Sequence, residues 1–316
     1  MDAGVDGDQG LMSTSTTVTP SPARAGEGIG RALSRYFALH QRSRLIALVS
    51  APLAWILLLY IGSLAMMVVA AFWSVDSFTG SVVRTFGLGN FETLFTQSVY
   101  RDVALRSLGV AVSVTLLDAA LALPIALYAS KITTSARVRY AIVILTTMPL
   151  WAGYLVKAYA WRIMLDTNGV LDWALAPLGL HGPGLGLVAT TLALAYLWLP
   201  YMILPVYAAL DRLPNSVLDA SADLGAGPAR TLRAVVLPII MPGLIAGSIF
   251  TFSLSLGDYI MVKIVGGTTQ MFANIVYDNI GVAGNLPFAA AAATFPIIVV
   301  VGYLAAVRRT GALENL

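Results

Sequence analysis

The sequence predicts an all-α integral membrane protein that crosses the bilayer six times. The chain has 316 residues, of which 58% are hydrophobic and only 11% are charged, and its mean hydropathy is +0.80. Soluble domains contain roughly 25% charged residues, so this composition excludes an ordinary soluble protein. Six apolar runs are each long enough to span a bilayer, and only helices satisfy their own backbone there at this length.

The chain divides into a tail and a membrane domain. Residues 1–40 are rich in Gly, Ser, Thr and Pro and have no apolar core typical of a signal peptide, so we expect a disordered tail. The transmembrane domain follows at 41–316. We expect its spanning helices at about 45–75, 107–130, 140–165, 185–210, 234–260 and 288–307. Prolines interrupt several of these runs, which is tolerated in membrane helices.

Basic residues predict the orientation of these helices. Most of them fall on the side that holds both chain ends and the second and fourth loops: Arg24, Arg31, Arg35, Arg42, Arg44, Lys131, Arg137, Arg139, Arg212, Arg230, Arg233, Arg308 and Arg309. The other side has fewer basic residues, and acidic residues accompany them. The positive-inside rule therefore predicts that both termini are cytoplasmic, in a multi-pass protein of the cell membrane.

The loop between the fourth and fifth runs contains a short polar helix, expected at about 215–225. Ser216 followed by Asp219 is the spacing of a capping box, which predicts the start of this helix. Val217, Ser221 and Leu224 fall on one face, which we interpret as a face that docks into a groove. Gly225 predicts a left-handed stop that turns the chain back toward the membrane.

The same loop carries a motif with long-range spacing. It contains Asp219-Ala220-Ser221, three residues, Gly225, nine residues, and then Val235-x-Leu237-Pro238. This resembles the coupling signature of ABC importer permeases, Glu-Ala-Ala, three residues, Gly, nine residues, Ile-x-Leu-Pro. Asp, Ser and Val replace Glu, Ala and Ile, and the following Pro242-Gly243-x-x-Ala246-Gly247 also fits. A capped loop helix without a special role would explain the residue types but not this spacing.

The resemblance implies a type I ABC importer permease fold over roughly residues 45–310. It implies that the cytoplasmic coupling helix contacts an ATPase subunit through Asp219, Ala220, Ser221, Leu224 and Gly225, with Leu237 and Pro238 beginning the next helix. The implied partners are a second homologous permease subunit, two ABC ATPase subunits, an extracytoplasmic solute-binding protein and the lipid bilayer, with no nucleic acid. ATP and Mg²⁺ would be bound by the ATPase subunits, and this chain would hold no cofactor.

Two more stretches resemble the spermidine/putrescine permease branch. The first contains Met148-Pro149-Leu150-Trp151 and continues through Tyr154, Lys157, Tyr159 and Trp161-Arg162 to Asn168-Gly169. The second contains Leu256-Gly257-Asp258-Tyr259 and the later Gly266-Gly267. The resemblance implies a polyamine or similar cationic cargo. A permease for another small solute, such as an amino acid or an opine, is the alternative.

Six residues are candidates for the substrate path. Asp118 lies midway along the second run, where an ionisable group is costly and often functional. Asp258, with the aromatic residues near it, suits an amine through ion pairing and cation–π contact. An interfacial aromatic belt or a structurally bonded aspartate would explain the same residues. The six candidates are Asp118, Trp151, Tyr154, Tyr159, Asp258 and Tyr259.

The sequence excludes several chemistries. It has no Cys and two distant His residues, so we expect no disulfide and no metal site. It contains neither a P-loop nor H-E-x-x-H, so we expect no catalytic residues and no ATP hydrolysis by this chain. Gly257-Asp258 and Tyr277-Asp278 only superficially resemble an intramembrane aspartyl protease. A stand-alone secondary transporter would need ion-coupling carboxylates in several helices, and a non-transport scaffold is the remaining alternative.

Overall fold

The computed structural model describes residues 41–308, without the side chains of 41–47 and Ala51. The predicted disordered tail, residues 1–40, lies outside the described residues. The chain divides into two units after Leu64, which we treat separately. Within the described part of the first unit, the chain is helical throughout, as the N-terminal portion of α2 (Gln41–Ala70). The second unit holds every candidate site residue.

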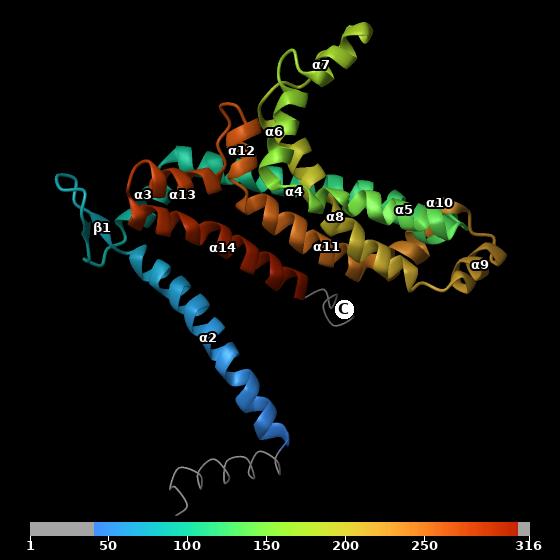
Figure 1. Cartoon of the computed structure of the whole chain (residues 1–316), viewed down its shortest axis with the longest axis horizontal. Helices are drawn as coiled ribbons and strands as arrows, with labels where there is room; N and C mark the ends of the chain where they lie inside the picture. The colour runs from blue at the N-terminus through green and yellow to red at the C-terminus, as the bar shows by residue number, and fades with distance from the viewer. Residues whose placement is uncertain (1–40, 309–316) are drawn as a thin grey trace, which may run out of the picture. The chain divides into compact units, whose positions relative to one another are not determined.

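The second unit is almost entirely helical (Figure 1). Its longer helices are α3 (Gly89–Thr96), α4 (Ser98–Leu127), α5 (Ala136–Thr147), α6 (Tyr154–Leu165), α8 (Leu187–Asp211), α9 (Asn215–Asp223), α11 (Leu237–Gly257), α13 (Phe272–Gly281) and α14 (Leu286–Arg308). Short helices are α7 (Val170–Leu175), α10 (Pro228–Thr231) and α12 (Ile260–Val265), with tighter or wider turns at η1 (Tyr128–Ile132), η2 (Met148–Trp151), η3 (Ala176–Leu178) and η4 (Leu232–Val236). Strands β1 (Ser74–Val75) and β2 (Val82–Val83) pair antiparallel, with Ser74 opposite Val83.

Five helical stretches in the described chain are long and apolar enough to cross a membrane. They are Leu48–Ala70, Ser98–Ile132, Leu187–Asp211, Pro228–Gly257 and Leu286–Arg308. A sixth candidate span is the pair Ala136–Trp151 with Tyr154–Leu178, which is bent by 99° at the break between its two parts. This agrees with the predicted all-α membrane fold of six spans, and α8 and α14 lie within two residues of their predicted ranges.

The predicted third helix at 140–165 is wrong as a single helix. Pro149 has no N–H to donate, and the chain tightens into η2 and breaks before Tyr154. The Lys157 ammonium donates a hydrogen bond to the Pro149 carbonyl at 2.9 Å, which satisfies one backbone group at the break. Hydropathy could not reveal this break because the residues on both sides of it are apolar.

The ends of the first two predicted helices also differ. The first ends at Ala70 rather than near residue 75, because the Asn90 amide donates to the carbonyls of Ala71 and Trp73 at 2.9 and 2.8 Å. The second begins at Ser98 rather than 107 and therefore includes charged residues such as Arg101 and Asp102. Charged residues in the first turns of a helix lower the local hydropathy but do not prevent helix formation.

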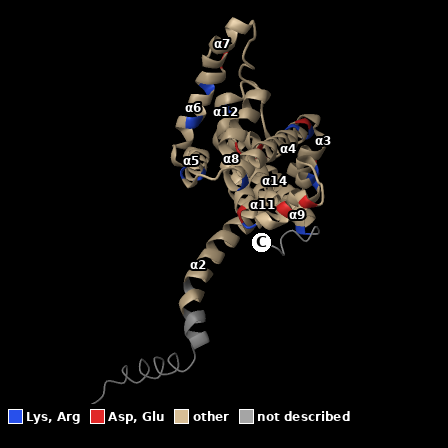
Figure 2. Ribbon diagram, turned by 90° about the vertical axis from the view of Figure 1, so that its right-hand side faces the viewer, with Lys and Arg blue, Asp and Glu red and all other residues tan. Residues whose placement is uncertain are grey.

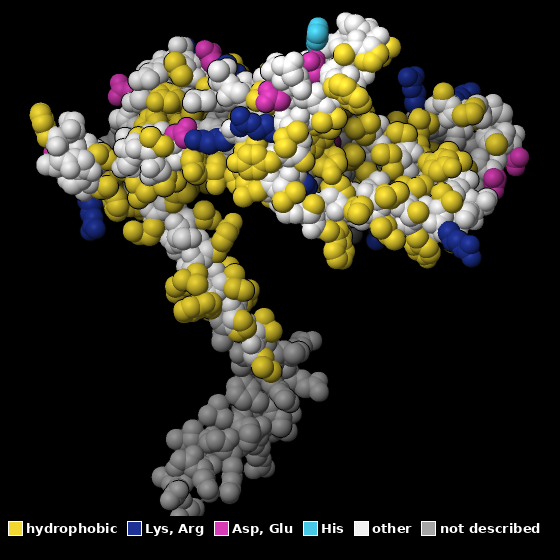
Figure 3. Space-filling view, turned by 45° about the horizontal axis from the view of Figure 1, so that its top comes forward, with side chains coloured by type: hydrophobic (Ala, Val, Ile, Leu, Met, Phe, Trp, Pro, Cys, Tyr) yellow, Lys and Arg dark blue, Asp and Glu magenta, His cyan; other side chains and the backbone are white. Residues whose placement is uncertain are grey.

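The core is formed where α4, α8 and α11 pack together. Two apolar clusters follow one another along these helices, one containing Val114 and Leu194 and the other containing Ala126 and Val206. Figure 2 shows Lys and Arg on α5 and α6 and Asp and Glu close to α9 and α3, while most of the ribbon of the second unit carries neither. Figure 3 shows that hydrophobic side chains cover much of the visible surface of this unit, as expected for a protein surrounded by lipid.

Two glycines let α11 approach α8 closely. A Cβ atom at Gly243 would lie 2.7 Å from the Pro205 carbonyl oxygen, and one at Gly247 would lie 2.6 Å from the Met202 sulfur. Both distances are too short for any side chain. This G-x-x-x-G spacing is a common way for membrane helices to pack, and it explains why the sequence places glycine at both positions.

Candidate functional site

The first candidate site is the polar helix α9 and the turn that follows it. Figure 1 shows α9 and α10 together at the end of the second unit away from β1, α3 and α13. Gly225 has a φ of +77°, so the predicted left-handed stop is confirmed. Its N–H donates to the Ala222 carbonyl at 2.8 Å, and the Ala226 N–H donates to the Ser221 carbonyl at 3.1 Å. This pair of bonds is a Schellman motif, which closes the helix and reverses the chain.

The predicted cap at the start of this helix is wrong. The helix begins at Asn215 with Pro214 at the N-cap, and no side chain caps it. Ser216 is the second helical residue and Asp219 the fifth, so neither can bond to the free N–H groups of the first turn in the predicted way. Instead the Lys131 ammonium donates to the Leu213 carbonyl at 2.5 Å and fixes the chain just before the helix.

The predicted docking face is also corrected. Ser221 is only 8% exposed and Val217 packs against the apolar cluster of α8 and α11, so both residues point into the protein. Leu224 is 88% exposed, and Asp219 and Ala220 are exposed as well. The face available to a partner therefore contains Asp219, Ala220 and Leu224, because the helix uses its other side to pack on its own subunit.

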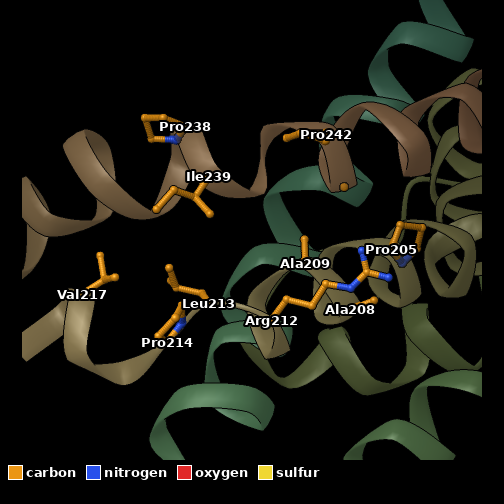
Figure 4. Close-up of a pocket in the computed structure, with 11 residues that line it drawn as sticks. Pro205, Ala208, Ala209, Arg212, Leu213, Pro214, Val217, Pro238, Ile239 and Pro242 are labelled. Atoms are coloured by element: carbon orange, nitrogen blue, oxygen red, sulfur yellow. The ribbon is translucent and has the colours of Figure 1, made fainter. Parts of the chain in front are cut away.

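A cavity of about 540 Å³ lies behind this helix, between α8 and α11. Figure 4 shows Leu213, Pro214 and Val217 on one side of it and Pro238 and Ile239 on the other. Arg212 also lines it, and no side-chain hydrogen bond of Arg212 is found within the described chain. Leu237 is half-buried and Pro238 exposed at the start of α11. Val217 of α9 and the motif residue Pro238 thus face a common space, although 21 positions separate them.

The second candidate site is a cavity of about 280 Å³ where α6, α8 and α11 meet α12. Its wall includes Tyr154 from α6, Trp198 from α8, and Ser253, Asp258 and Tyr259 from α11 and the residues that follow it. The Tyr154 hydroxyl donates a hydrogen bond to the Asp258 carboxylate. The other carboxylate oxygen accepts the Met261 N–H at 3.0 Å, which ties Asp258 to the first turn of α12.

The structure brings together three of the six predicted path residues, namely Tyr154, Asp258 and Tyr259. Trp151 and Tyr159 are exposed and do not line this cavity. Asp118 is fully buried in α4, and neither carboxylate oxygen has a hydrogen-bond partner among residues 41–308. It lines neither the cavity behind α9 nor the cavity at Asp258. Groups of three or more potential metal ligands are absent from this part of the chain.

A comparison with known protein families shows which family has this architecture. The family described as binding-protein-dependent transport system inner membrane component matches residues 45–308. The chain belongs to this family. It is an ABC transporter permease, a transport subunit rather than an enzyme.

Curated relatives of this permease agree with the family. The inner membrane ABC transporter permease protein YdcU of Escherichia coli is 43% identical over 314 residues, which covers 95% of this chain and 99% of YdcU. The spermidine/putrescine transport system permease protein PotB of Haemophilus influenzae is 30% identical over 207 residues, covering 64% of this chain and 71% of PotB. The similarity to YdcU therefore extends over nearly the whole permease.

Solved structures show the same fold. A chain from a bacterial ABC transporter involved in alginate import superposes with a TM-score of 0.65 at 15% identity, covering 88% of this permease and 99% of that chain. A chain of the MetNI methionine ABC transporter superposes with a TM-score of 0.52 at 20% identity, covering 66% of this permease and 93% of that chain. At these identities the likeness supports the type I permease fold and nothing more specific.

Sequence reasoning missed three residues at these sites. Trp198 and Ser253 line the cavity beside Asp258 but lie in uncharged apolar runs, where no local pattern distinguishes them from other helix residues. Lys131 contributed only to the predicted orientation, and its bond to Leu213 joins residues 82 positions apart. No sequence signal in a single chain could have found such pairs.

Proposed function

We propose that this permease imports a polyamine such as putrescine or spermidine as half of an ATP-driven transporter. A second homologous permease forms the other half of the path. An extracytoplasmic binding protein delivers the solute, and two ATPase subunits bind ATP and Mg²⁺. The protein lies in the bacterial cytoplasmic membrane with both termini in the cytoplasm, as the distribution of Lys and Arg favours.

The similarity to PotB is the observation that carries the cargo class. That relative is a spermidine/putrescine permease by name, and the cavity at Asp258 supplies the chemistry that an amine requires. A nearly buried carboxylate, 8% exposed, stands there among aromatic rings from Tyr154, Trp198 and Tyr259. Carboxylates and ring faces both attract alkylammonium groups.

The exposed face of α9 supports the coupling role. Asp219, Ala220 and Leu224 are available to an ATPase subunit, while the Schellman turn and the Ser221–Thr231 contact hold the helix on its own subunit. Closure of the ATPase subunits would then move α9 and, through α10, the start of α11. We propose Asp219, Ala220, Leu224 and Gly225 as coupling residues, with Ser221, Leu237 and Pro238 transmitting the movement.

A reconstituted complex tests this function. The permease is assembled with its second permease, ATPase subunits and binding protein, and ATP hydrolysis is measured with and without putrescine or spermidine. Polyamine-stimulated hydrolysis that Gly225→Val abolishes, while the complex still assembles, is the expected result. Stimulation by another solute, such as an amino acid or opine, would refute the polyamine cargo. Uptake without any ATPase subunit would instead indicate a stand-alone secondary transporter.

A further inference from the structure

The cavity at Asp258 contains hydrogen-bonding capacity that the described chain does not use. The indole N–H of Trp198 and the hydroxyl of Ser253 are both buried, and neither has a partner among residues 41–308. Both side chains line this cavity. A buried polar group without a partner lowers stability, so such groups are usually satisfied by a ligand or by water. The Ser253 hydroxyl can accept a hydrogen bond from a ligand in this cavity, whereas the Trp198 N–H can only donate one, so a ligand that carries only donors would contact the Trp198 ring and not its N–H.

The geometry limits what this site can bind. Asp258 already accepts hydrogen bonds from Tyr154 and Met261, one on each carboxylate oxygen, which leaves further lone pairs and a negative charge. Ser253 supplies a second oxygen acceptor, and the aromatic side chains of Tyr154, Trp198 and Tyr259 also line the cavity. A primary ammonium has three N–H donors and one positive charge, which matches these acceptors and rings.

Elsewhere in this permease, a carboxylate and an aromatic ring together contact the ammonium of a lysine. The Lys263 ammonium lies 2.5 Å from an Asp278 carboxylate oxygen and 4.6 Å from the centre of the Tyr277 ring. Tyr277 in turn stacks on Tyr259, with ring centres 4.6 Å apart. A carboxylate and a tyrosine ring therefore hold an alkylammonium near the cavity, and the cavity itself combines the Asp258 carboxylate with aromatic side chains.

We propose that Trp198, Ser253 and Asp258 form a transient subsite for one terminal primary ammonium of the transported solute. Ser253 and Asp258 accept its N–H groups, and the Trp198 ring faces its charge. A cavity of about 280 Å³ has room for the ammonium and a short alkyl chain. This inference rests on the proposed polyamine function and adds two residues that neither the motif nor the family relationship assigns.

Matched variants test the subsite in the reconstituted complex. Ser253→Ala removes the acceptor, and Ser255→Ala is its control, because Ser255 is a buried α11 serine whose hydroxyl also lacks a described partner but does not line the cavity. Putrescine uptake is measured at saturating binding protein. We expect Ser253→Ala to lower the maximal rate about 10-fold, as for a hydrogen bond to a charged group, and Ser255→Ala to leave it within about 2-fold of wild type.

Two substitutions at Trp198 distinguish the contribution of its aromatic ring from that of its N–H. Trp198→Phe keeps a π face and should retain most of the uptake, whereas Trp198→Leu should lower it about 3- to 10-fold. The binding-protein concentration giving half-maximal uptake should stay unchanged in all variants, because the subsite lies after delivery. A purely structural role would instead lower the thermal stability of the complex in parallel with uptake.

Two results overturn the subsite. Equal uptake by Ser253→Ala and Ser255→Ala, with putrescine still transported, would refute it and leave the polyamine function intact. A wild-type complex that couples ATP hydrolysis to another solute and carries no diamine would refute the polyamine function and the subsite together.

Discussion

The hydroxyl oxygens of Ser221 and Thr231 lie 2.9 Å apart, so one of them donates a hydrogen bond to the other. Ser221 belongs to α9 and Thr231 to α10, on either side of the turn at Gly225. The contact closes the loop into one unit, and it is largely buried on the Ser221 side. A movement applied to the exposed face of α9 therefore reaches α10 and the start of α11 without depending on the turn alone.

Breaking this contact should weaken coupling more than stability. We expect Ser221→Ala and Thr231→Val each to lower the free energy of unfolding by about 1 kcal/mol. Each should also lower substrate-stimulated ATP hydrolysis while basal hydrolysis persists. The double variant should lose less stability than the sum of the two single variants, because each of the three variants removes the same hydrogen bond. Strictly additive effects on stimulation would show that the hydroxyls act independently.

Gly225 should be far less replaceable than Gly227. A Cβ at either position meets no atom within 4 Å, but Gly225 has φ +77° and Gly227 has φ −71°. Gly225→Ala should therefore cost about 1 kcal/mol through backbone strain and reduce solute-stimulated hydrolysis. Gly227→Ala should be close to wild type in the same assay. Equal effects of the two substitutions would mean that the left-handed turn is not required for coupling.

The contact between α8 and α11 should tolerate no side chain at its glycines. Gly243→Ala and Gly247→Ala would place a Cβ within 2.7 Å of Pro205 and Met202 atoms, and we expect each to cost about 1–3 kcal/mol. Thermal unfolding of the purified complex measures this loss. Gly302→Ala in α14 is the control, since its Cβ meets no atom within 4 Å, and it should unfold at or above the wild-type temperature.

Substitutions of Asp118 should preserve or raise stability but lower uptake. Its buried carboxyl has no described partner, so Asp118→Asn should not lower the unfolding temperature and Asp118→Leu should raise it. Because ionisable groups at membrane depth usually serve transport, we expect putrescine uptake to fall at least about 10-fold in both. Unchanged uptake in the stabilised variants would remove Asp118 from the substrate path.

Cysteine labelling can test the proposed orientation directly, because the natural sequence has no Cys. Leu224 is 88% exposed at the end of α9, and Phe78 is 98% exposed in the loop that joins β1 to β2. A membrane-impermeant thiol reagent added to intact cells should label Phe78→Cys and not Leu224→Cys. The opposite result would reverse the proposed topology and refute the cytoplasmic position of α9.

The sequence by itself determined the membrane class, most of the apolar spans and the short helix α9 with its left-handed stop at Gly225. These follow from properties that are local in the chain. The length of each apolar run predicts a span, and the spacing from Asp219 to Pro238 defines the motif. Gly225 predicts a left-handed backbone conformation, since few other residues adopt a positive φ without strain.

The tertiary structure decided which side chains meet. The sequence could not place Asn90 on the end of α2 or Lys131 on Leu213, because such bonds join distant positions through three-dimensional proximity. It also misassigned the cap and the docking face of α9, since packing against α8 and α11 determined which side of that helix is buried. Trp198 and Ser253 reach the cavity of Asp258 for the same reason: in an apolar helix, only its neighbours decide which residues face a site.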